Sequence, residues 1–159
     1  MIKIKIISVG KIKEKALKTL IDEYLKRLSR FAKVEIIELN DLSVPDNPSP
    51  SEIKAVIVKE GIEISKHINS RSFVISMCIE GKKKTSEEFA DLLNDTQNRF
   101  SEITFIIGSS HGLSDDIKNA SNLRLSMSDM TFPHNIAKFM LIEQIYRSYK
   151  IINNENYHK

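Results

Sequence analysis

The chain has 159 residues, of which 41% are hydrophobic and 28% charged, with only 5 Gly and 4 Pro. This is an ordinary globular composition, which excludes a disordered or fibrous chain. The formal net charge of +3, from 24 basic and 21 acidic residues, is too small to identify a nucleic-acid partner by itself. We therefore expect a single domain over residues 1–159, with a hydrophobic core of its own.

The cysteine count and the apolar segments predict where the protein resides. Cys78 is the only cysteine, so no internal disulfide can form, and we expect a cytoplasmic protein. No apolar run approaches the roughly 18 residues that cross a bilayer, so no membrane partner is expected. The N-terminal stretch alternates Lys with Ile, which is typical of a strand and not of a signal peptide.

Strand-like and helix-like patterns alternate through the first half of the chain. Ile2–Val9 is the first predicted strand and Val34–Leu39 the second. Between them, apolar residues from Leu17 to Leu28 recur at helical spacing and form one face. Ser49-Pro50-Ser51-Glu52 offers an N-cap, a proline and a glutamate in the order that begins another helix.

The alternation continues in the second half. Ser72–Ile79 and Ile103–Ile107 are the next predicted strands, and the runs Val74–Ile79 and Ile103–Ile107 are almost continuously apolar, which is typical of central parallel strands covered on both faces. Thr85-Ser86-Glu87-Glu88 predicts a helix start between them, and Leu123–Met127 is a fifth strand. The pattern predicts an α/β fold with a mainly parallel sheet. Ligands of such sheets bind beyond the carboxyl ends of the strands.

The last predicted helix, which follows Pro133, is apolar on two faces. Its apolar residues fall into two sets, Ile136, Phe139 and Met140 on one side and Leu141, Ile142, Ile145 and Tyr149 on the other. A helix that is apolar on two faces is buried on two faces. In so short a chain, a second copy of the protein could cover one of them, and we therefore expect a homodimer.

Few residues point to chemistry on their own. Gly108 and Gly112 follow a strand but match no phosphate-binding pattern, so a turn without a ligand is an equal interpretation. The four histidines lack metal-ligand spacing, and no metal is expected. Cys78 lies in an apolar strand, where it would act as a small hydrophobic residue. Glu143 and Arg147, four residues apart, are either a helix-surface pair or a substrate contact.

Three segments of the sequence resemble the RlmH family of ribosomal RNA methyltransferases. They read IIGSSHGL (106–113), LSMSDMTFPHNIAKFMLIEQIYRSYKI (125–151) and ENYHK (155–159). The resemblance extends over essentially the whole chain. It implies a SPOUT fold, in which helices flank a mainly parallel sheet and the C-terminal segment forms a trefoil knot. It also implies a homodimer that transfers a methyl group from S-adenosyl-L-methionine to N3 of a pseudouridine in 23S rRNA, within the ribosome.

The resemblance also assigns site residues. The donor site it implies consists of Met77, Gly108, Met127, Ser128, Asp129, Met130, Thr131 and Phe132. On the acceptor side it places His158 and Tyr157 against the target base and Arg147 against a phosphate or a carbonyl. A dimer that binds RNA or ribosomes without catalysis is the alternative, and binding of S-adenosylmethionine without RNA separates the two. A nucleotide-phosphate binder that uses Gly108 and Gly112 is a third possibility, although that loop contains no lysine.

Overall fold

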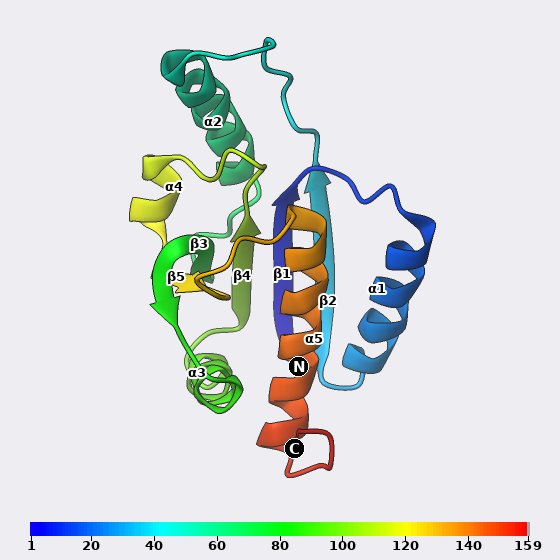
Figure 1. The fold of residues 1–159 in the computed structure, drawn as a ribbon. Coiled ribbons are helices and arrows are strands. Elements are labelled where there is room, and N and C mark those ends of the chain that lie inside the picture. Colours follow the sequence, from blue (N-terminus) through cyan, green and yellow to red (C-terminus); the bar gives the residue numbers. More distant parts are fainter. Residues whose placement is uncertain (159) are drawn as a thin grey trace.

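A computed structural model describes residues 1–158 of the chain (Figure 1). Strands and helices alternate along it, as the sequence predicts. In chain order they are β1 (Ile2–Val9), α1 (Lys15–Leu28), β2 (Ala32–Leu39), α2 (Pro50–Ser65), β3 (Phe73–Lys83), α3 (Ser86–Gln97), β4 (Glu102–Ile107), α4 (Asp115–Ala120), β5 (Leu123–Ser126) and α5 (His134–Ile152).

The five strands form one parallel sheet in the order β2-β1-β4-β3-β5. Because all five run the same way, their carboxyl ends lie along one edge, and the loops that can hold a ligand gather there. β4 occupies the centre, and all of its residues are buried. This confirms the prediction that its continuous apolar run belongs to a central strand covered on both faces.

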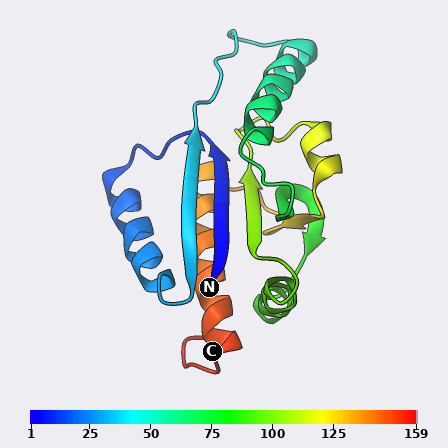
Figure 2. The ribbon, with the colours of Figure 1, turned by 180° about the vertical axis from the view of Figure 1, so that it is seen from behind.

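Helices cover both faces of the sheet (Figures 1 and 2). The larger core joins the sheet to α1, α3 and α5, and a smaller core joins the opposite face to α2 and α4. Figure 2 shows β1 and β2 in front of α5, which runs along the sheet behind them. The two predicted capping boxes are present, with Ser49 at the start of α2 and Thr85 at the start of α3.

Two features differ from the expected elements. The short helix α4 was not expected, because six residues hold too few turns to show a period. β3 was expected to end at Ile79, but it continues to Lys83 after an irregular stretch between Met77 and Lys82. Gly81 lies in that stretch, where a Cβ atom would come within 2.7 Å of the backbone of Leu125. The polar sequence that follows Gly81 resembles a loop, although its backbone pairs with β5.

The last helix, α5, packs against α1 and α3. Leu141, Ile142 and Ile145 are fully buried within the same chain, so one of the two predicted apolar faces is part of the core. The other face is more open: the side chain of Ile136 is 41% exposed, and Phe139 is half-buried against the ring of Tyr24.

Candidate functional site

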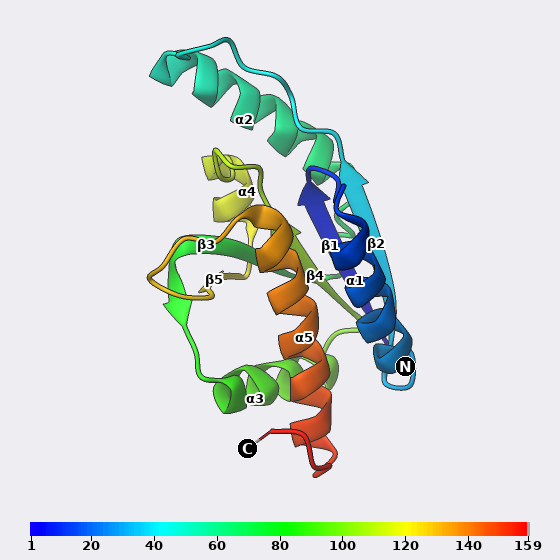
Figure 3. The ribbon, with the colours of Figure 1, turned by 45° about the vertical axis from the view of Figure 1, so that its right-hand side comes forward.

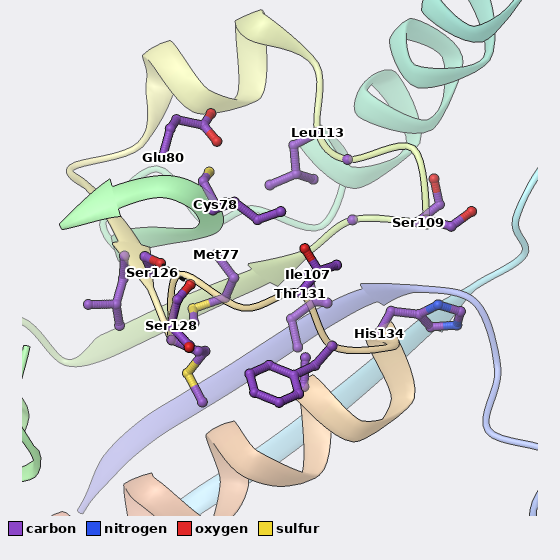
Figure 4. Close-up of a pocket in the computed structure, with 18 of the residues that line it drawn as sticks. Met77, Cys78, Glu80, Ile107, Ser109, Leu113, Ser126, Ser128, Thr131 and His134 are labelled. Atoms are coloured by element: carbon purple, nitrogen blue, oxygen red, sulfur yellow. Dashed lines mark hydrogen bonds between the residues drawn. The ribbon is translucent and has the colours of Figure 1, made fainter. Parts of the chain in front are cut away.

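A cavity of about 730 Å³ opens at the carboxyl edge of the sheet (Figure 4). Its wall is formed by the irregular part of β3, the loop that follows β4, and the segment that joins β5 to α5. Met77, Ser109 and Thr131 represent these three parts in Figure 4 and line the same space. The cavity therefore lies where the parallel topology predicts a ligand site.

The loop after β4 is a tight turn built on two glycines. The Gly112 N–H donates to the carbonyl of Ser109 at 2.9 Å, and Gly112 has a φ of +93°, a conformation that other residues rarely adopt. A Cβ atom on Gly108 would lie 2.5 Å from the Gly112 carbonyl oxygen. Both glycines are therefore required by the turn, which brings backbone to the cavity where a side chain would otherwise stand.

Serines take the place of glycines in the segment between β5 and α5. The Ser126 hydroxyl donates to the Ser128 carbonyl at 3.0 Å, and the Ser128 hydroxyl accepts from the Met130 N–H, also at 3.0 Å. Short side chains that bond to nearby backbone hold such turns in place. This explains how a segment without glycine turns sharply beside the cavity.

The structure brings together seven of the eight residues expected at the donor site. They are Met77, Gly108, Met127, Ser128, Met130, Thr131 and Phe132, all of which line the cavity. Asp129 does not line the cavity: its side chain is 82% exposed and accepts a hydrogen bond from the Lys83 ammonium group at 2.6 Å. That ion pair links the end of β3 to the segment after β5.

Several lining residues were missed by sequence reasoning, among them Glu80 and Lys118. The Lys118 ammonium group donates to the Glu80 carboxylate at 2.5 Å, and this bond lowers the pKa of Glu80. Glu80 directly follows the expected end of the third strand, so the strand-end rule could have identified it. Cys78 also lines the cavity, and burial raises the pKa of its thiol.

The three residues expected on the acceptor side form a second cluster at the C-terminal end of α5. The Arg147 guanidinium group donates to Glu143 Oε1 from Nε at 3.1 Å and from Nη2 at 2.6 Å, and this pair raises the pKa of Arg147. The Tyr157 hydroxyl donates to the same carboxylate oxygen at 3.0 Å, and the Arg147 guanidinium carbon lies 4.8 Å from the centre of the Tyr157 ring. Glu143 thus holds both residues, and the pair predicted from the spacing exists.

His158 lies between a donor and an acceptor in this cluster. Its Nδ1 is 3.2 Å from Arg147 Nη1, and its Nε2 is 2.6 Å from Glu87 Oε1 on α3. Because a guanidinium group can only donate, Nδ1 accepts and Nε2 carries the hydrogen. The arrangement therefore selects one neutral tautomer of His158. No sequence pattern pointed to Glu87, since 71 residues separate the partners.

Burial raises the pKa of the Tyr157 hydroxyl, and its hydrogen bonds with Tyr24 and Glu143 raise it further. Tyr157 is therefore protonated at neutral pH, and because it donates its one hydroxyl hydrogen to Glu143, its oxygen accepts the hydrogen bond from Tyr24. The four aromatic rings of Tyr24, Phe139, Tyr146 and Tyr157 pack edge to face, with centroid separations of 5.0 to 5.7 Å. This packing joins the tail to α1 and to the open side of α5.

Comparison with known proteins identifies the family. The model of a family described as predicted SPOUT methyltransferases matches residues 2–158. The ribosomal RNA large subunit methyltransferase H of Clostridium botulinum (strain Okra / Type B1) is 51% identical over 157 residues, which cover 98% of this chain and 99% of that protein. The protein of the same name from Clostridium botulinum (strain Loch Maree / Type A3) is 49% identical, with the same coverage. This chain belongs to the RlmH family of SPOUT methyltransferases.

In this SPOUT methyltransferase the two clusters of predicted site residues lie far apart. The cavity adjoins the first turn of α5, whereas Arg147 lies in its last two turns and the tail folds back beside α3 (Figure 3). The 19 residues of α5 make a helix about 28 Å long. One chain therefore does not bring the residues predicted for the donor site and those predicted for the acceptor side together.

Residues 1–158 of this SPOUT chain include neither a helix that could span a membrane nor a cluster of metal-binding side chains. No helix there is long and apolar enough, and no group of three or more His, Cys, Asp or Glu side chains could hold a metal ion. Within the described residues, the predicted site residues other than Asp129 gather in the cavity and in the tail cluster.

Proposed function

We propose that the protein transfers a methyl group from S-adenosyl-L-methionine to N3 of a pseudouridine in 23S rRNA, on the ribosome and in the cytoplasm. The observation that carries the proposal is the cavity at the carboxyl edge of a SPOUT sheet, lined by the residues that the family resemblance assigns to the donor. The names of full-length relatives support an acceptor in large-subunit ribosomal RNA.

The residues of the cavity fit this donor. Its volume of about 730 Å³ lies within the range of small-molecule sites, which are mostly apolar with a few polar groups at their edges. Met77, Ile107 and Phe132 provide an apolar wall for an adenine ring. The turn at Gly108 allows the ligand to approach backbone directly, because no side chain can stand there.

The chain contributes mainly by positioning. In the donor, the methyl group is bound to a positively charged sulfur atom, which becomes a neutral thioether when the methyl group is transferred. No covalent intermediate with the protein is therefore needed. The cavity walls hold the donor in one orientation and exclude water from the transfer. The loops after β4 and β5 therefore select one orientation of the bound donor.

The tail cluster suits the acceptor. N3 of pseudouridine loses its proton as the methyl group arrives, and a base or a group that stabilises negative charge would assist. Arg147 can stabilise charge on a neighbouring carbonyl, and Tyr157 offers an aromatic surface for the base. His158 can accept the proton only after exchanging one of its present bonds, to Arg147 or to Glu87, for a contact with the acceptor.

We further propose that the active unit is a homodimer in which the tail of one protomer meets the donor cavity of the other. The separation of the two clusters along α5 supports this arrangement, because a tail held at the far end of its own helix cannot reach its own cavity. The open apolar face of α5, which includes Ile136, provides a surface that a second copy would cover.

Methyl transfer from labelled S-adenosylmethionine to ribosomes that lack the modification tests the proposal, with free 23S rRNA as a parallel substrate. We expect label on N3 of a pseudouridine, and label on ribosomes alone would show that the assembled shape is read. Label at another atom would contradict the assigned acceptor. Failure of both transfer and donor binding would instead favour a non-catalytic RNA- or ribosome-binding dimer.

A further inference from the structure

Glu60, on α2, is a buried carboxylate outside the site described above. Its relative exposure is 5%, and within residues 1–158 no basic side chain lies within ion-pair distance of it. Burial of an ionisable group without a countercharge is costly unless hydrogen bonds compensate. The position of Glu60 therefore calls for an explanation beyond packing.

The two oxygens of this carboxylate hold two different loops. Oε1 accepts a hydrogen bond from the Ser109 hydroxyl at 2.8 Å, and Oε2 accepts one from the backbone N–H of Leu42 at 3.2 Å. Ser109 belongs to the loop after β4, and Leu42 to the loop after β2. A carboxylate on a helix thus connects two loops at the carboxyl edge of the sheet.

The next residue, Gly61, allows α2 to pack closely against the end of the loop after β4. A Cβ atom there would come 2.5 Å from the Ser114 hydroxyl oxygen, so α2 approaches the end of that loop as closely as a glycine permits. Ser114 is also the N-cap of α4, where its hydroxyl accepts from the Ile117 N–H. Glu60 and Gly61 therefore fix the loop at both of its ends.

Ser109 transmits this restraint to the donor cavity. It lines the cavity beside Gly108, and its hydroxyl oxygen accepts a hydrogen bond from the His111 N–H at 3.4 Å. Its carbonyl accepts the Gly112 N–H that closes the turn. A change in the position of Ser109 would shift the backbone that forms one wall of the cavity.

We infer that Glu60 is a positioning residue for the methyl-donor site, acting through Ser109 on the turn between Gly108 and Gly112. The inference rests on the proposed function, since it assigns the donor to this cavity. Glu60 touches neither donor nor acceptor. Its role is to hold the turn in the one conformation that admits the donor, so that binding does not have to order the loop.

A double-mutant cycle tests this role, with calorimetric binding of S-adenosylmethionine to the full-length protein as the readout. We expect Glu60→Ala and Ser109→Ala each to weaken binding about tenfold, because each removes a hydrogen bond to a charged group. The double variant should also be about tenfold weaker, and not about 100-fold, because both substitutions break the same bond. The rate of methyl transfer at saturating S-adenosylmethionine should change by less than about threefold.

Two variants control for a purely structural effect. Glu63→Ala removes an exposed carboxylate that lies about one turn further along α2 and pairs with Lys66. This variant should leave donor binding unchanged. Glu60→Gln keeps one acceptor oxygen for Ser109 and should recover part of the lost affinity. A loss of thermal stability without a loss of donor affinity would show that Glu60 serves the fold alone.

Glu60→Ala should still fold, because Glu60 also lines a second cavity of about 400 Å³. Water from that cavity can take the place of the lost carboxylate. If Glu60→Ala nevertheless fails to fold, Ser109→Ala and Glu60→Gln decide the matter, and unchanged affinity in both would overturn the inference. Independent, multiplying effects in the double variant would overturn it as well. Absence of donor binding by the unmodified protein would instead contradict the proposed function.

Discussion

The two ends of α5 show two different ways of building a site. At its first turn, the cavity is formed by backbone turns and apolar side chains, and the loops are held by glycine conformation and short serine bonds. At its last turns, the tail is held by charged and aromatic side chains that converge on Glu143 and Glu87. The first arrangement depends on backbone geometry between neighbouring residues, whereas the second depends on side-chain contacts between distant segments.

This difference predicts that changes at the two ends separate donor binding from methyl transfer. The donor end should tolerate no added volume, because backbone atoms already fill the space around Gly108. Changes at the tail should leave the fold and donor binding intact, because the tail packs at the C-terminal end of α5, far from the cavity. The four tests that follow address this separation directly.

Gly108→Arg should have the largest effect on donor binding. A side chain there would collide with the Gly112 carbonyl and fill the cavity, so we expect binding of S-adenosylmethionine to weaken at least about 100-fold. Calorimetry measures the affinity, and sedimentation checks that the oligomeric state is unchanged. Ala120→Arg, which adds the same side chain at an exposed position of α4, is the matched control. Retained affinity in Gly108→Arg would show that the donor binds elsewhere.

Removal of residues 157–159 should abolish methyl transfer and spare donor binding. The deletion removes Tyr157 and His158, which we assign to the acceptor, so transfer to ribosomes should fall by at least about 100-fold. The donor dissociation constant should change by less than about twofold, since the cavity lies at the other end of α5. Asn156→Ala, at an exposed tail position, should behave like the unmodified protein. Full activity of the shortened chain would exclude a role for the tail.

A mixture of these two inactive proteins tests whether cavity and tail come from different chains. After subunit exchange, half of the dimers should be hybrids, and each hybrid should contain one intact pairing of cavity and tail. We therefore expect recovery of about a quarter of the unmodified activity. A mixture that stays inactive despite proven exchange would place both parts of the site in the same chain.

Glu87→Ala should give the smallest effect. The hydrogen bond from its own backbone N–H lowers the pKa of Glu87, and the contact with His158 lowers it further, so the carboxylate is ionised at neutral pH and orients the imidazole. An exposed pair contributes little, and we expect transfer to slow by about threefold with donor binding unchanged. Glu87→Gln retains an acceptor for His158 and should restore most of the rate. Equal losses in both variants would mean that the charge, and not the orientation, matters.

Local patterns predicted those parts of the fold that depend on neighbouring residues. The capping boxes at Ser49 and Thr85 bond residues three apart, and both were predicted and found. The burial of β4 followed from its continuous apolar run. The strand-end rule indicated the regions after the third, fourth and fifth strands, whereas the individual donor-site residues were predictable only through the family resemblance, because the segment after β5 contains no motif of its own.

Interactions between distant residues could not be predicted. Glu60 and Ser109 are 49 residues apart, and His158 and Glu87 are 71 apart, so no helical or strand period relates them. The extension of β3 to Lys83 depends on the approach of Gly81 to the backbone of β5, which is a tertiary contact. The trefoil knot stays a prediction of the resemblance. The homodimer, expected both from the two apolar faces of α5 and from the resemblance, also stays a prediction, and the subunit-exchange experiment tests it.

The position of Cys78 gives the protein a built-in chemical reporter. It is the only thiol in the sequence and lines the donor cavity, and burial raises the pKa of the thiol, so the group stays protonated and reacts slowly at neutral pH. A bound donor would cover it and slow its reaction further. The rate at which a thiol reagent labels the unmodified chain should therefore fall as the donor concentration rises, which reports occupancy without any substitution.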